Sequence, residues 1–78
     1  MKEKARKIIK DYHLTSRFVA SLAGYSIRTG NYYMKNNTNK EISFNIENAI
    51  LAWYEIMMLK REKLMENKGY REWLIHSD

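Results

Sequence analysis

The apolar positions of this chain recur at helical spacing from the first residues onward. In a first segment from about Lys2 to Tyr12, apolar side chains follow one another at intervals of three and four residues, which places them on one helical face: Ala5, Ile8, Ile9 and Tyr12. No segment shows the alternating pattern of a strand, and the chain contains no proline to interrupt a helix. The pattern predicts an all-α fold, a compact helical bundle of about five helices in a single domain spanning residues 1–78.

Two short helices after this first segment are predicted from their capping residues. Thr15 is suited to the N-cap of the second helix, because its hydroxyl can accept a free backbone N–H of the first turn. Gly24 is expected to end that helix in the left-handed conformation, and Ser26 to cap a third helix that reaches about Lys35. The polar residues 36–40 predict a loop, and the five residues that follow are expected to be irregular as well.

A fourth predicted helix is apolar on two faces. It is expected to begin near Asn45, with Glu47 in the first turn where the helix dipole favours an acid, and to continue to about Asn67. One apolar stripe comprises Ile46, Ile50, Trp53, Met57 and Leu64, and a second comprises Leu51, Tyr54, Met58 and Met65. A helix on one small domain needs a single stripe, so the second predicts burial against another surface. That surface is either another protein or a short last helix after Gly69 with Tyr70, Trp73 and Leu74.

Charge divides the chain into two unlike halves. Residues 1–40 contain nine Lys/Arg and two acidic residues, a balance of +7, whereas residues 41–78 contain five Lys/Arg and seven acidic residues, a balance of −2. This asymmetry predicts a basic half that faces a polyanion and an apolar, mildly acidic half with a structural or partner-binding role.

Catalytic and metal-binding patterns are missing from the sequence. There is no cysteine, the two histidines are far apart, and no phosphate-cradling glycine-rich loop or nucleophile and base pair can be assembled. We therefore expect a protein that is not an enzyme and uses no cofactor or metal. No stretch is apolar enough for a membrane span or a signal peptide, which predicts a cytoplasmic protein with no membrane partner.

Residues 14–36 resemble the Cro/CI-like helix-turn-helix family. The resemblance rests on the small Ala20 where two helices would touch, on Gly24 in the turn, and on Ser26 as the cap of the helix that enters the major groove. It implies that the third helix presents its polar residues to DNA, with Arg28 on guanine, Asn31 on adenine and Lys35 on phosphate. The nucleic-acid-binding residues expected on this basis are Arg17, Ser26, Arg28, Asn31, Tyr32 and Lys35.

Two features depart from the pattern of that family. Gly30 stands where the family places a buried Ile or Val, which predicts a packing hole and a third helix that is short, bent or filled by a neighbouring tyrosine. Phe18 and Leu22 lie on a face of the second helix that is usually polar. They either pack under the C-terminal helix or belong to an exposed contact patch.

Two functions remain open at this point. The first is an accessory subunit that binds DNA, double- or single-stranded, and docks on a larger replication or priming protein. The combination of a tiny helix-turn-helix and an apolar helix is similar to the small proteins that accompany a polymerase-like primase in staphylococcal cassette elements. The alternative is a Cro-like transcriptional repressor that forms a homodimer through the fourth helix. The residues expected to contact the partner are Phe18, Leu22, Leu51, Tyr54 and Met58.

Overall fold

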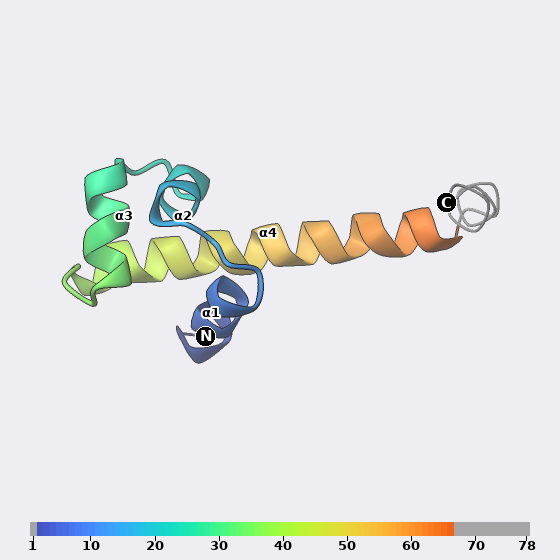
Figure 1. Cartoon of the computed structure of the whole chain (residues 1–78), viewed down its shortest axis with the longest axis horizontal. Helices are drawn as coiled ribbons and strands as arrows, with labels where there is room; N and C mark the ends of the chain where they lie inside the picture. Colours follow the sequence, from blue (N-terminus) through green and yellow to red (C-terminus); the bar gives the residue numbers. More distant parts are fainter. Residues whose placement is uncertain (1, 67–78) are drawn as a thin grey trace.

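The computed structural model describes residues 2–66, and side chains as far as Glu62. These residues form four helices: α1 (Lys2–Asp11), α2 (Ser16–Leu22), α3 (Ile27–Met34) and α4 (Lys40–Glu66) (Figure 1). The predicted all-α character is therefore confirmed, with four helices in the described range where about five were expected for the whole chain. The expected last helix with Tyr70, Trp73 and Leu74 lies outside the described residues.

Helix α4 is the axis around which the other helices pack. In Figure 1, α2 and α3 lie on one side of its N-terminal half and α1 on the other. Contacts join α1 to α4, α2 to α4 and α2 to α3. At about 1.5 Å per residue, the 27 residues of α4 account for most of the 48 Å length of the molecule. The C-terminal part of α4 consequently extends beyond the other three helices.

The core lies where the three short helices meet the first half of α4. Its buried apolar residues come from all four helices: Ala5, Ile8, Ile9, Val19, Tyr33, Ile46 and Ile50. The apolar stripe predicted for the first helix is thus found at three of its four positions. The fourth, Tyr12, follows the last residue of α1 and keeps 39% of its surface exposed.

The predicted caps of the two central helices are confirmed. The Thr15 hydroxyl accepts the backbone N–H of Phe18 at 3.1 Å, and the Ser26 hydroxyl accepts that of Thr29 at 3.3 Å. Gly24 has a φ of +76°, the left-handed conformation expected of a residue that follows a helix end. Local side-chain chemistry therefore determines both ends of the turn that joins α2 to α3.

The predicted start of the fourth helix is wrong by five residues. Helix α4 begins at Lys40, and the cap is Asn39, whose side-chain oxygen accepts the backbone N–H of Ile42 at 2.8 Å. Asn45, the predicted cap, lies inside the helix and donates to the hydroxyl of Tyr25 at 2.8 Å. The polar sequence of residues 36–45 conceals the helix, because both asparagines are good caps and only packing of Ile42 against the core selects the first one.

The predicted role of Glu47 at a helix terminus is also wrong. Glu41 is the acid of the first turn, whereas Glu47 is only 5% exposed and accepts a hydrogen bond from the Tyr33 hydroxyl at 3.2 Å. The guanidinium of Arg6 lies 4.2 Å from the centre of the Tyr33 ring and donates to the Tyr33 carbonyl oxygen at 2.9 Å. Burial raises the pKa of Tyr33 to about 12, so its hydroxyl remains a hydrogen-bond donor at neutral pH. These groups join α1, α3 and α4.

Gly30 is a point of close helix packing, and the packing hole expected there is absent. Helix α3 runs through Gly30, which is buried. A Cβ atom at this position would collide with the carbonyl oxygen of Ser16 and lie 2.8 Å from the Cβ of Ala20. The prediction of a helix that stops short at Gly30 is therefore wrong, and the space is filled by α2 and not by a neighbouring tyrosine. The missing side chain allows the backbones of α2 and α3 to touch.

Candidate nucleic-acid interface

The outer face of α3 is a continuous exposed surface. All six residues predicted to bind nucleic acid are at least partly accessible and lie on α2, on α3 or at the caps of α3: Arg17, Ser26, Arg28, Asn31, Tyr32 and Lys35. Ile27 lies among them and is 46% exposed. The structure thus brings the predicted residues of α3 together on one surface, and it holds that surface against α2 through Gly30.

Neighbouring groups hold the side chains of this surface in place. The Arg28 guanidinium donates to the Tyr32 hydroxyl at 2.9 Å and lies 5.6 Å from the centre of that ring. The Ser16 hydroxyl donates to the Asn31 side-chain oxygen at 2.5 Å, which links the middle of α3 to the first turn of α2. These contacts reduce the side-chain entropy that binding a ligand would cost.

Four of the five predicted partner-contact residues are half-buried against the rest of the protein. The Phe18 ring meets the Trp53 ring edge to face, with 5.3 Å between their centres, and this contact fastens α2 to α4. Leu22, Leu51 and Tyr54 pack against the buried core. Met58, the fifth, is half-buried beyond it. The exposed apolar residues in this region are Ile56 and Leu59, with 55% and 57% of their surfaces accessible, and neither was among the predicted contacts.

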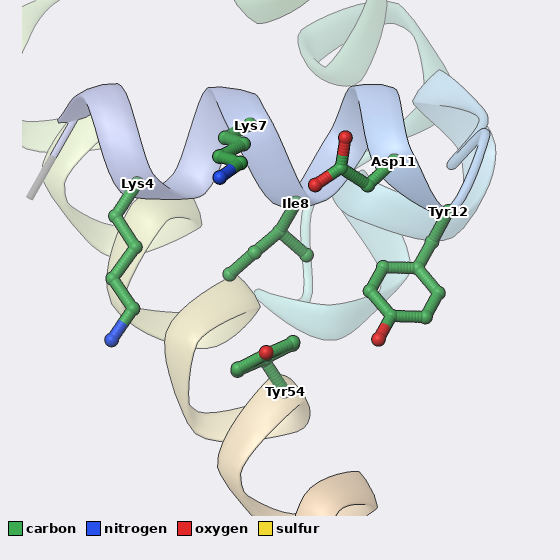
Figure 2. A pocket seen from close by; sticks show the side chains of 6 residues that line it. All are labelled: Lys4, Lys7, Ile8, Asp11, Tyr12 and Tyr54. Carbon is green, nitrogen blue, oxygen red and sulfur yellow. The ribbon is translucent and has the colours of Figure 1, made fainter.

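A cavity of about 490 Å³ lies between α1 and α4 (Figure 2). It is lined by two basic residues, an acid, an aliphatic residue and two tyrosines: Lys4, Lys7, Ile8, Asp11, Tyr12 and Tyr54. Sequence reasoning missed this site. Its only trace in the sequence is that Lys4, Lys7 and Asp11 share one face of the first helix, because the tyrosine from α4 arrives there through tertiary packing.

A smaller cavity adjoins the first along α4. It measures about 260 Å³ and is lined by Lys4, Tyr54, Glu55, Met58, Leu59 and Glu62. Two residues, Lys4 and Tyr54, line both cavities. The smaller cavity is lined by two acids and one lysine, and the larger one by two lysines and one acid.

The geometry places some limits on other kinds of site. Among the residues that the structure describes, no three His, Asp or Glu side chains cluster closely enough to hold a metal ion. Within the same range, no helix combines the length and apolarity needed to cross a bilayer.

The accessible groups are thus basic, amide and aromatic side chains on α3, and lysines of α1 beside Tyr12 and the α4 residue Tyr54. Such groups contact phosphates and bases, and their arrangement is the physical basis for a functional assignment. Comparison with protein-family models, with curated proteins and with solved structures gives no match to this chain.

Proposed function

We propose that this chain is a non-enzymatic DNA-binding protein in which α2, the turn at Gly24 and α3 act as a helix-turn-helix. The observation that carries the proposal is the contact at Gly30, where the backbone of α3 packs directly on α2. Two short capped helices joined by a tight glycine turn and packed this closely form the unit that presents a helix to the major groove.

The side chains on the outer face of α3 supply the chemistry of this function. An arginine can donate two hydrogen bonds to guanine, and an asparagine can pair with the edge of adenine, which are the proposed roles of Arg28 and Asn31. Lys35 and Arg17 are both exposed, and their proposed role is to contact backbone phosphates. The +7 balance of residues 1–40 adds a long-range attraction to the duplex.

Removing the basic groups of α3 is expected to weaken duplex binding. We expect Arg28→Ala with Lys35→Ala to lower affinity by between ten- and a hundredfold, because one base contact of about 1–3 kcal/mol and one phosphate contact are lost. The logarithmic salt dependence should also become shallower by about 0.9 for the lost phosphate contact. Fluorescence anisotropy with a labelled duplex that has been selected from a random-sequence pool for tight binding, titrated at several salt concentrations, measures both quantities.

A matched control for this experiment is Lys60→Ala with Arg61→Ala. It removes the same charge from exposed positions on the distant part of α4. We expect this control to retain most of the affinity. Equal losses in the two double variants, or an affinity that does not change with salt, would contradict the assignment to α3.

We further propose that the protein is an accessory subunit that docks through α4 onto a larger replication or priming protein. The supporting observation is that α4 extends beyond the other helices and keeps Ile56 and Leu59 exposed next to the half-buried Met58. Apolar side chains on opposite sides of one helix are typical of a helix with a second protein surface against it. The alternative is the Cro-like repressor, in which a second copy of this chain covers α4.

The substitution Met58→Asp is expected to have different effects under these two alternative functions. For the accessory subunit, sedimentation at micromolar concentration should show a monomer, and Met58→Asp should leave duplex affinity within about twofold of the native value, because the α3 surface is untouched. For the repressor, a dimer should dissociate and duplex binding should fall with it, because half-site reading needs the pair. Asn48→Asp, at an exposed position of the same helix, is the control for added charge.

A further inference from the structure

The cavity between α1 and α4 combines a fixed aromatic surface with positive charge. The Tyr12 ring meets the Tyr54 ring at a centre-to-centre distance of 6.0 Å and the Trp53 ring at 5.9 Å, both edge to face. Tyr12 nevertheless keeps 39% of its surface accessible. The contacts with two neighbouring rings restrict the motion of the Tyr12 ring, and its accessible part remains free to contact a ligand. Such a ring can stack on a nucleic-acid base with little loss of side-chain conformational entropy.

The two lysines stand on the same side of α1 as the cavity. Lys4 and Lys7 are exposed, lie about one helical turn apart and line the cavity. In Figure 2 the Lys4 side chain extends to the level of the Tyr54 ring, and Ile8 lies between Lys7 and that ring. Successive phosphates of a nucleic-acid strand are the ligands that such a pair of ammonium groups attracts. Aromatic rings next to basic side chains are characteristic of sites for single strands.

Asp11 indicates which part of the ligand enters the cavity. Its carboxylate lines the same cavity and would repel a ligand that consists of phosphate alone. It can instead accept a hydrogen bond from the exocyclic amino group of a base, as acidic side chains do with cytosine. Thymine has no exocyclic amino group and can donate only its ring N3–H, so the acid favours an amino-bearing base over thymine.

The charge of the adjoining smaller cavity limits the path of the strand. Glu55 and Glu62 line that cavity beyond Tyr54. Phosphates are repelled from this end and attracted to the end where Lys7 stands. The distribution of charge along the groove therefore favours a nucleotide in the larger cavity and disfavours one in the smaller.

We propose that this cavity binds one unpaired nucleotide of single-stranded DNA, with its base on Tyr12 and Tyr54 and its neighbouring phosphates on Lys4 and Lys7. The base must be unpaired, because in a duplex the neighbouring base pairs cover its faces. The residues that line the site come from α1, from Tyr12 directly after it and from α4, and none of them belongs to α2 or α3. The site is separate from the duplex-binding surface proposed for α3 and does not rest on it.

The first test compares two pairs of lysines on the same helix. Lys4→Ala with Lys7→Ala removes the cavity pair, and Lys2→Ala with Lys10→Ala removes two exposed lysines that do not line the cavity. With a labelled oligo-deoxycytidine, we expect the first variant to bind about tenfold more weakly and its salt slope to fall by about 1.4 for two lost contacts. The second variant should change the affinity by no more than about threefold. Equal losses would overturn the proposal.

The second test removes the stacking surface and leaves the charges unchanged. Tyr12→Leu preserves an apolar side chain at a partly exposed position, and it is expected to weaken single-strand binding about tenfold through the lost base stacking. Asp11→Asn should reduce the preference for oligo-deoxycytidine over oligo-deoxythymidine. Circular dichroism establishes that the variants are folded. Unchanged affinity in a folded Tyr12→Leu protein would overturn the proposal.

Photochemical cross-linking locates the site in the native protein. A single strand with a photoreactive halogenated cytosine should attach to Tyr12 or Tyr54, as mapped by mass spectrometry of the peptides. Arg28→Ala should lower duplex affinity and leave this cross-link intact, so a failure of the α3 assignment is distinguishable from a failure here. Cross-links confined to α3 would show that the cavity does not bind a base.

Discussion

Replacing Gly30 with alanine is expected to destabilise the protein by about 3 kcal/mol. The added Cβ would collide with the backbone carbonyl oxygen of Ser16 and would lie 2.8 Å from the Cβ of Ala20. A backbone carbonyl inside a helix cannot move aside as a flexible side chain can, so α2 and α3 must separate. Alanine is a better helix former than glycine by about 1 kcal/mol, and this gain is too small to offset the collision. Urea unfolding followed by circular dichroism measures the difference.

Two further variants distinguish steric collision from other causes. Gly24→Ala introduces a side chain where nothing lies within 4 Å, and its cost of about 1 kcal/mol comes only from the positive φ. Adding Ala20→Gly to Gly30→Ala relieves the second contact but not the carbonyl collision, and glycine inside α2 costs about 1 kcal/mol of helix propensity. The double variant should therefore be no more stable than Gly30→Ala. A Gly30→Ala protein as stable as the native one would contradict the close packing of α2 on α3.

Replacing Tyr33 with alanine is expected to cost about 4 kcal/mol, a large share of the stability of a domain this small. The Tyr33 ring is fully buried, and it is contacted by Arg6 from α1 while its hydroxyl bonds to Glu47 of α4. Its removal leaves a cavity at the junction of three helices and also leaves the Glu47 carboxylate without its donor. Denaturant unfolding of the purified variant gives the loss in the free energy of unfolding.

A more conservative set of substitutions isolates the buried hydrogen bond from the packing. Tyr33→Phe keeps the ring under Arg6 and is expected to cost about 1–2 kcal/mol, because Glu47 is left as a buried acceptor with no partner. Adding Glu47→Leu removes the acceptor as well and should recover most of that loss. If Tyr33→Phe alone were neutral, the hydrogen bond would contribute nothing to the junction.

The sequence alone was sufficient for features that depend on neighbouring residues. The apolar spacing of the first segment, the hydroxyls of Thr15 and Ser26, and the left-handed turn at Gly24 each act within a few residues, and each is found in the structure. The difference in net charge between residues 1–40 and residues 41–78 could also be predicted, because net charge is a sum over the residues of each segment. Exposure of the predicted α3 residues follows from the same helical period, since their face lies opposite the buried Tyr33.

Features that depend on distant contacts were decided only by the tertiary structure. Asn39 and Asn45 are equally good caps, and packing of Ile42 on the core selects Asn39. From the sequence, Gly30 predicts a packing hole in the third helix, and only the packing of α2 against it shows that a side chain has no room there.

The buried position of Glu47 and the cavity beside Tyr54 have the same kind of origin. From the sequence, Glu47 is predicted to be an acid of the first helical turn, whereas in the structure it accepts a hydrogen bond from the Tyr33 hydroxyl. Tyr54 lines the same cavity as the lysines of α1, although it is about fifty positions away from them in the chain. A periodic pattern reports which face of a helix is buried. Which partner buries that face depends on contacts between distant segments, and no local pattern encodes them.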